Sequence, residues 1–136
     1  MTKNGEKLLY EKESYIIRGA TIKIWQQFGS AFKENIIENA LNEELQTQKL
    51  NIEKQKRINV YYNNKKIGVY IPDLIINDKI LLELKRKPFL TKQDKQQFWY
   101  YLKATKYKLG FLINFGDRGL QIKRRIYDKA RNNQSA

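Results

Sequence analysis

The sequence contains no cysteine and no histidine. Without cysteine the chain cannot form disulfides, thiolate zinc sites or iron–sulfur clusters, and without histidine it has no imidazole base or imidazole metal ligand. Any hydrolytic chemistry must therefore use carboxylates, lysine, hydroxyls or a hard metal ion held by oxygen ligands.

Long apolar runs and chain-breaking residues are also scarce. No run of about eighteen apolar residues is present to span a bilayer, and the segment Met1–Glu13 is polar, unlike a signal peptide. The chain has two prolines, and no repeat or low-complexity linker divides its 136 residues. We therefore expect one soluble domain over residues 1–136, located in the cytoplasm and without a membrane partner.

Positive charge is abundant and unevenly distributed. The net charge is +13, but residues 1–84 carry 13 Lys and Arg against 11 Asp and Glu, whereas residues 85–136 carry 14 against 3. A one-sided positive field of this kind suits a polyanion such as nucleic acid. The alternative is that an AT-rich genome imposes the abundance of Lys, Asn, Ile and Tyr without selection for binding.

The apolar pattern predicts three helices and five strands. Two helices come first, one from Ser14 to Phe28 capped by Ser14 and one from about Ala31 to Gln48 capped by Ser30. Three antiparallel strands follow, then a helix opened by a Thr91/Asp94 capping box, then two strands. The expected elements after the second helix are Ile58–Tyr62, Ile67–Ile76, Ile80–Lys85, Lys92–Thr105, Leu109–Phe115 and Gln121–Tyr127. This order predicts an α/β (α+β) fold with a mixed sheet of about four to five strands flanked by helices.

Charged residues interrupt two strands that are otherwise apolar. Asp73 lies within one strand, and Glu83 and Lys85 lie on the same face of the next because side chains alternate along a strand. If Asn77–Lys79 is a three-residue loop, Asp73 pairs with Glu83. A two-residue loop would place Asp73 opposite Leu82 and break the cluster unless a bulge restored it.

Two facing carboxylates repel each other, and a divalent cation is the simplest group that neutralises them. Carboxylate oxygens suit Mg²⁺ or Mn²⁺, so a site for metal-activated water is one interpretation of Asp73 and Glu83. The other interpretation is structural: Glu83 and Lys85 are edge charges paired with neighbours, and Asp73 ends a strand.

The motifs resemble those of a nuclease superfamily. Pro72-Asp73 followed by Glu83-Leu84-Lys85 resembles the PD-(D/E)xK signature of restriction-endonuclease-like nucleases, and Gln97 with Tyr101 resembles the QxxxY helix motif of the RecB-like branch. From about Ile16 to Ile126 the sequence is similar to the GxxExxY group of that superfamily. Of that group's three named residues only Glu34 is kept, because Ala31 and Ile37 stand at the glycine and tyrosine positions.

The resemblance implies roles for individual residues. Asp73, Glu83 and Glu34 would bind the metal, and Lys85 would orient water and stabilise charge on the phosphate. Gln97 and Tyr101 share one helix face and would contact the substrate or metal-bound water. Independently of the resemblance, helical geometry places Glu34 inside the apolar arc of its helix and Glu38 at the edge of that arc.

Two groups of basic residues are candidates for nucleic-acid binding. Lys87, Lys92 and Lys95 follow the predicted site closely, and three more basic residues are consecutive on the last strand. Both groups can neutralise phosphates, although solvated surface charge is the alternative. The second group is Lys123, Arg124 and Arg125.

These observations favour a nuclease that uses Mg²⁺ or Mn²⁺ to hydrolyse phosphodiester bonds, with DNA favoured over RNA. Two alternatives stay open at this stage. One is a non-catalytic nucleic-acid-binding module of the same fold, and the other is a dimeric, structure-selective endonuclease resembling Holliday-junction resolvases, which would make the chain a homodimer.

Overall fold

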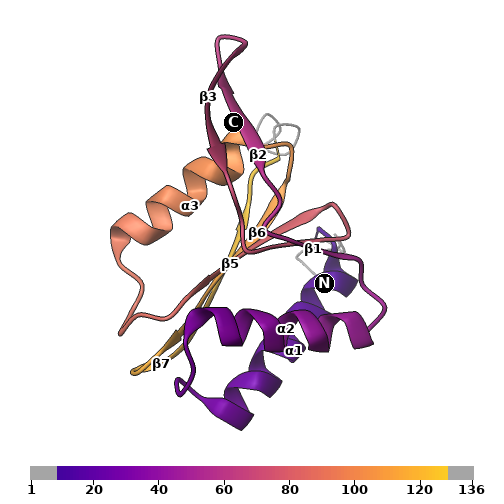
Figure 1. Cartoon of the computed structure of the whole chain (residues 1–136), viewed down its shortest axis with the longest axis vertical. Helices are drawn as coiled ribbons and strands as arrows, with labels where there is room; N and C mark the ends of the chain where they lie inside the picture. Colours follow the sequence, from indigo (N-terminus) through magenta and orange to yellow (C-terminus); the bar gives the residue numbers. More distant parts are fainter. Residues whose placement is uncertain (1–8, 129–136) are drawn as a thin grey trace, which may run out of the picture.

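The computed structural model describes residues 9–128, so the two ends of the expected domain 1–136 (residues 1–8 and 129–136) lie outside the described residues. Within residues 9–128 the chain forms three helices and seven strands (Figure 1). In chain order these elements are α1 (Glu11–Phe28), α2 (Glu34–Thr47), β1 (Ile52–Lys54), β2 (Ile58–Tyr62), β3 (Lys65–Tyr70), β4 (Leu74–Ile76), β5 (Ile80–Lys85), α3 (Lys92–Ala104), β6 (Leu109–Gly116) and β7 (Gly119–Ile126).

The strands of the described chain form a central mixed sheet and a separate hairpin. The five-stranded sheet has the order β1-β4-β5-β6-β7, in which β5 and β6 run parallel and the other neighbours run antiparallel. The parallel pair follows from the α3 crossover between β5 and β6. This architecture confirms the predicted α/β fold with a mixed sheet flanked by helices.

The prediction of three consecutive antiparallel strands was wrong in its topology. β2 and β3 pair only with each other, and the predicted strand Ile67–Ile76 is divided at Ile71–Asp73, so that only β4 joins β5. Proline cannot donate to a strand ladder, which makes Pro72 a natural point of interruption. The place beside β4 is taken by β1, a strand of three residues that is too short to show an apolar period.

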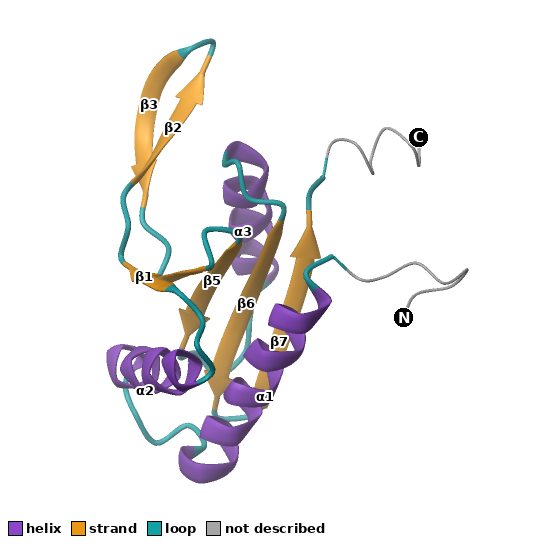
Figure 2. Ribbon diagram, turned by 90° about the vertical axis from the view of Figure 1, so that its right-hand side faces the viewer, coloured by secondary structure: helices purple, strands orange, loops and turns teal. Residues whose placement is uncertain are grey.

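The helices cover both faces of the central sheet. Figure 2 shows α1 and α2 on one side and α3 on the other. The core between the sheet and the first two helices contains Ile17 and Ile24 from α1 and Leu41 and Leu45 from α2. In residues 9–128 no helix has the length and apolar character needed to cross a membrane.

The opposite face is covered by α3, which packs closely on β6. A Cβ atom at Gly110 would lie 2.6 Å from Cζ of Phe98, so only glycine leaves room for that ring. Phe98 and Leu102 are buried here, as the helical spacing predicts. This packing determines which face of α3 lies against the sheet.

Two of the three predicted helix starts were wrong. α1 begins at Glu11, so Ser14 lies inside the helix and is buried, and α2 begins at Glu34 after Lys33 rather than after Ser30. Neither helix has a side-chain cap, so no capping residue marks either start. The capping box of α3 is confirmed, because Thr91 and Asp94 bond each other's backbone N–H groups.

Candidate active site

The register between β4 and β5 brings Asp73 and Glu83 together. Asn77 and Asp78 adopt left-handed φ angles of 53° and 49°, and the three-residue loop pairs Ile76 with Ile80 as predicted. The pairing continues to Leu74 and Leu82, so Asp73 and Glu83 follow at the next position. Oδ2 of Asp73 accepts a hydrogen bond of 2.7 Å from the backbone N–H of Leu84, which holds the carboxylate against β5.

Burial raises the pKa values of both carboxyl groups, and the charge of Asp73 raises the pKa of Glu83 further. Burial, followed by the charge of Asp73, raises the pKa of Glu83 to about 8 against the opposing effects of Lys85 and Tyr70. Burial raises the pKa of Asp73 as well, although hydrogen bonds from Leu84 and Gln55 oppose it. A half-buried acid pair with raised pKa values is typical of a functional site that binds a positively charged partner.

Lys85 supplies the positive charge of this cluster. It lies two residues after Glu83 on the same strand face, and its charge lowers the pKa values of Asp73, Glu83 and Glu34. Among the described residues, no hydrogen bond or ion pair holds its ammonium group in place. The Lys85 side chain is therefore available to a ligand.

Two stacked tyrosines close the site on the side of α3. The hydroxyl of Tyr70 donates a hydrogen bond of 3.1 Å to Oε1 of Glu83. The ring of Tyr70 stacks on the ring of Tyr101, with centroids 4.0 Å apart. Burial and the charge of Glu83 raise the pKa of Tyr70, so this hydroxyl keeps its proton at neutral pH.

A small cavity lies between the cluster and α3. Glu83, Lys85, Gln97 and Tyr101 line it, and its volume is about 20 Å³. That space holds about one water molecule next to polar groups. The structure thus brings Gln97 and Tyr101 to the same place as Glu83 and Lys85.

The helix carboxylates are arranged differently from the prediction. Glu34 is exposed at the first turn of α2, whereas Glu38 is buried, so the expectation that Glu34 points inward was wrong. The core stripe of α2 is Ile37, Leu41 and Leu45, and Glu38 lies beside it one turn further from the helix start. Partial burial of the Glu34 carboxyl raises its pKa first, and the charge of Asp73 raises it further. Glu34 therefore remains within electrostatic reach of the cluster.

Gln55 connects Glu38 to Asp73. Its side-chain nitrogen donates to Oε1 of Glu38 at 2.8 Å and to Oδ1 of Asp73 at 3.4 Å. Its backbone N–H donates to the carbonyl oxygen of Asp73 at 3.2 Å. Gln55 therefore fixes both the side chain and the backbone of Asp73 from the loop before β2.

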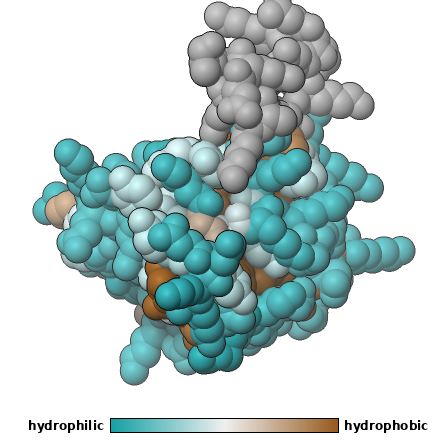
Figure 3. Space-filling model, turned by 90° about the horizontal axis from the view of Figure 1, so that it is seen from above, coloured by the Kyte–Doolittle hydropathy of each residue, from teal (hydrophilic) through white to brown (hydrophobic). Residues whose placement is uncertain are grey.

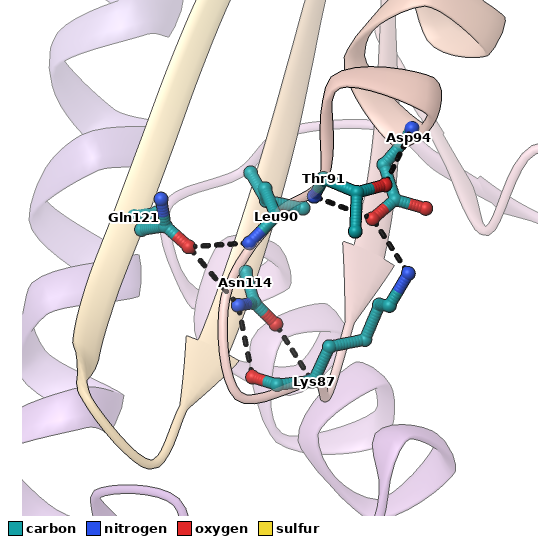
Figure 4. A network of polar contacts seen from close by, with 6 residues as sticks. All are labelled: Lys87, Leu90, Thr91, Asp94, Asn114 and Gln121. Carbon is teal, nitrogen blue, oxygen red and sulfur yellow. Dashed lines mark hydrogen bonds and ion pairs between the residues drawn. The ribbon is translucent and has the colours of Figure 1, made fainter.

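A buried polar network holds the loop between β5 and α3 (Figure 4). Asn114 is fully buried on β6; its side chain accepts from the Lys87 backbone N–H at 2.9 Å and donates to the Lys87 carbonyl at 3.0 Å. Gln121 on β7 accepts from Asn114 and from the backbone N–H of Leu90. Because this loop follows Lys85 and leads into α3, the network sets where Gln97 and Tyr101 lie.

The first group of predicted phosphate-binding residues is only partly free. Nζ of Lys87 bonds Oδ2 of Asp94 at 2.6 Å. Burial acts to raise the pKa of Asp94, but hydrogen bonds from Lys87 and Thr91 lower it to about 2. Lys87 is thus engaged in holding the start of α3, while Lys92 is exposed and Lys95 half-buried on that helix.

The second group is divided between the two faces of the sheet. Lys123 is opposite Leu112 and Arg125 is opposite Gly110, so both lie on the α3 face that carries Glu83. Arg124 points to the α1 face, where its guanidinium donates to the carbonyl of Leu9 at 2.6 Å. The prediction that all three form one phosphate-binding group is wrong for Arg124, because consecutive strand residues alternate in direction.

The donor set fits a hard divalent cation. Asp73 and Glu83 present oxygen atoms in a half-buried pair whose pKa values are raised, and such a pair becomes more stable when a cation neutralises it. In the part of the chain that the structure describes, no three acidic side chains converge on one metal position, so the expected set of Asp73, Glu83 and Glu34 is not assembled. Mg²⁺ is commonly held by one or two carboxylates and completes its shell with water, which two carboxylates satisfy.

Comparison with known proteins identifies the family. The model of the PD-(D/E)XK nuclease superfamily matches residues 11–126, and the chain belongs to that superfamily. Searches of curated proteins and of solved structures gave no significant match. The GxxExxY subgroup stays a prediction.

Several residues that shape the site escaped the sequence analysis. Asn114 gave a signal, because it is a lone polar side chain in the apolar strand Leu109–Gly116, as Asp73 and Glu83 are in their predicted strands. Gln55 gave none, because an amide in a loop is an ordinary surface residue, and helical periodicity placed Glu38 only at the edge of the apolar arc. In the sequence Tyr70 is a typical strand tyrosine, and only the structure shows that its hydroxyl bonds Glu83.

Proposed function

We propose that this chain is a nuclease that depends on Mg²⁺ or Mn²⁺ and hydrolyses phosphodiester bonds of DNA. The observation that carries the proposal is the half-buried Asp73–Glu83 pair, whose pKa values are raised, beside the ammonium of Lys85, which makes no hydrogen bond or ion pair with the described residues. A binding module gains nothing from acidic groups that face phosphate, whereas a hydrolase needs them to hold a cation.

In this proposal Asp73 and Glu83 hold the metal ion, and water completes its shell. When bound, the ion would lower the pKa of a water molecule and offset charge on the scissile phosphate. Glu34, exposed at the edge of the cluster, contributes negative charge from outside the first pair. Gln55 and the Leu84 backbone keep Asp73 in position before the ion arrives.

The other residues bind and orient the substrate. The Lys85 ammonium donates hydrogen bonds to a phosphate oxygen, where charge grows as the bond to the leaving oxygen breaks. Gln97 and Tyr101 have polar groups beside the same small cavity and orient water or phosphate there. Tyr70 donates to Oε1 of Glu83 and so restricts rotation of this carboxyl group.

Cleavage assays with variants test the proposal. Purified protein is incubated with supercoiled plasmid, linear duplex, single strand and four-way junction in Mg²⁺, Mn²⁺ or EDTA. We expect cleavage with metal only, and losses of about 100-fold or more in Asp73→Asn and Lys85→Ala because both lie at the reacting phosphate. The exposed-residue variants Glu43→Gln and Lys12→Ala are controls and should cleave as wild type does.

The same assays also distinguish the competing functions. Binding of nucleic acid by wild type without cleavage in any metal would overturn the nuclease and favour a binding module. Cleavage restricted to the four-way junction would instead support the dimeric structure-selective enzyme. Equal cleavage by Asp73→Asn and wild type would exclude the proposed site.

A further inference from the structure

The β2–β3 hairpin projects away from the central sheet. Figures 1 and 2 both show it extending past the end of α3, and its strands pair only with each other. An isolated two-stranded hairpin is at best marginally stable in water, so one that stands free is expected to serve a purpose that needs its exposure.

The outer half of the hairpin exposes large side chains on both faces. Tyr61, Tyr62 and Ile67 are 59%, 67% and 65% exposed. Tyr61 pairs across the ribbon with Lys66, and Tyr62 pairs with Lys65, so each face carries one tyrosine and one lysine. Seen from the end of the molecule where the hairpin lies, the surface is mostly hydrophilic with small apolar areas (Figure 3).

The charge of the hairpin identifies the kind of partner. From Arg57 to Tyr70 the chain contains three cations, Arg57, Lys65 and Lys66, and no acidic residue. Like charges oppose pairing of this ribbon with the same ribbon of a second copy, whereas a polyanion is attracted to it. A nucleic acid is therefore the partner that complements this surface.

The shape of the hairpin favours one form of nucleic acid. The major groove of B-DNA is about 12 Å wide and admits a two-stranded ribbon, whereas its minor groove is about 6 Å wide. The major groove of duplex RNA is too narrow for side chains to read. Single strands bind best to aromatic rings that share one surface, but Tyr61 and Tyr62 face opposite ways.

We propose that the β2–β3 hairpin enters the major groove of double-stranded DNA while the strand to be cut lies on the Asp73–Glu83 site. Lys65 and Lys66 then reach phosphates on the two walls of the groove, and Tyr61 and Tyr62 contact its sides. This inference rests on the proposed nuclease function and assigns its substrate as duplex DNA.

The base of the hairpin is built into the active site. Tyr70, the last residue of β3, bonds Glu83 and stacks on Tyr101. Val60 of β2 and Gln97, Tyr100 and Tyr101 of α3 line an adjoining apolar groove of about 310 Å³. Lys65 lies five positions before Tyr70 on β3, which at about 3.3 Å per residue puts the tip about 17 Å from the site, or about five base pairs of duplex.

Salt-dependent binding of a double variant tests the hairpin. Affinity is measured by fluorescence anisotropy in EDTA, which withholds the metal, for Lys65→Ala/Lys66→Ala and for wild type. On duplex DNA the slope of log affinity against log salt should become less steep by about 1.8, since each lost phosphate contact changes it by about 0.9. Affinity for single-stranded DNA and duplex RNA should change little.

A matched control separates the hairpin from general charge. Lys12→Ala/Arg18→Ala removes the same charge from exposed positions on α1, which covers the sheet face opposite α3. This double variant should leave the slope of log affinity against log salt nearly unchanged. Trypsin provides a direct measurement: duplex DNA should protect the bonds after Lys65 and Lys66, which are exposed at the hairpin tip.

The outcomes distinguish this proposal from the proposed nuclease function. Equal slopes for the two double variants, equal losses on single strands or duplex RNA, or no protection from trypsin would each overturn the hairpin proposal. Wild-type cleavage measured in parallel would then still support the nuclease. If wild type binds no nucleic acid and cleaves none, both proposals are overturned together.

Discussion

Replacing Glu83 with glutamine tests the electrostatics of the site while keeping its shape. The pKa of Glu83 is raised from 4.5 to about 8, first by burial and then by the charge of Asp73. The folded protein therefore holds this proton more tightly than the unfolded chain does. The contribution of Glu83 to the free energy of unfolding is fully present below about pH 4.5 and is lost as the pH rises through about 8.

The magnitude follows from the two pKa values. As the pH rises from about 5 to about 9, ionisation of the Glu83 carboxyl lowers the free energy of unfolding by about 4 kcal/mol in total. A glutamine has no carboxyl to ionise, and its amide oxygen still accepts the Tyr70 hydroxyl. When the pH is raised over this interval, the free energy of unfolding of Glu83→Gln should therefore fall by about 4 kcal/mol less than that of wild type.

Urea unfolding in EDTA at several pH values measures this difference. Glu43→Gln replaces an exposed glutamate on α2 and should follow wild type at every pH. If Glu83→Gln also follows wild type from about pH 5 to about pH 9, Glu83 is not a carboxyl group that the fold keeps protonated. The reasoning about the acid pair would then be refuted.

Variants at Asn114, Gly116 and Tyr101 probe how the site is supported. Asn114→Ala leaves the Lys87 backbone groups without partners and should lower the free energy of unfolding, measured in urea, by about 1–3 kcal/mol. Gly116→Ala places a Cβ atom 2.6 Å from the Lys87 carbonyl oxygen and should destabilise the protein and lower kcat. Gly19→Ala is its control: the added Cβ atom on α1 meets nothing within 4 Å, and the substitution should stabilise the protein by up to about 1 kcal/mol. Tyr101→Phe keeps the ring stacked on Tyr70 and should retain wild-type unfolding in urea, and Tyr101→Ala should not.

The carboxylate pair could be predicted because local rules determine it. The apolar run of β5 identifies a buried strand, its alternation sets the face of Glu83, and the Asn77–Lys79 loop sets the register with Asp73. The loop length was the one open variable, and the left-handed angles of Asn77 and Asp78 are those that such turns favour.

The departure of the hairpin from the sheet could not be predicted in the same way. Ile58, Val60 and Val69 have strand propensity wherever the strand pairs, and propensity does not say which sheet they join. The outcome depends on contacts distant in sequence, such as the stacking of Tyr70 on Tyr101 of α3.

The roles of Glu34 and Glu38 depended on where one helix begins. The predicted start at about Ala31 differs from the observed start at Glu34, which places Glu34 in the exposed first turn. A periodicity argument assumes that the residue already lies within the helix and over the core. At a helix end that assumption fails, because the chain there faces the edge of the sheet and solvent.

Proton release on metal binding tests the central claim, that Asp73 and Glu83 form one cation site. At about pH 7 a carboxyl with a pKa of about 8 is roughly nine-tenths protonated, and a cation that binds it must displace that proton. Calorimetric titration with Mn²⁺ in buffers of different ionisation enthalpy should give about 0.9 proton released per ion for wild type and nearly none for Glu83→Gln. Binding of Mn²⁺ by wild type without proton release, or no binding at all, would contradict the account.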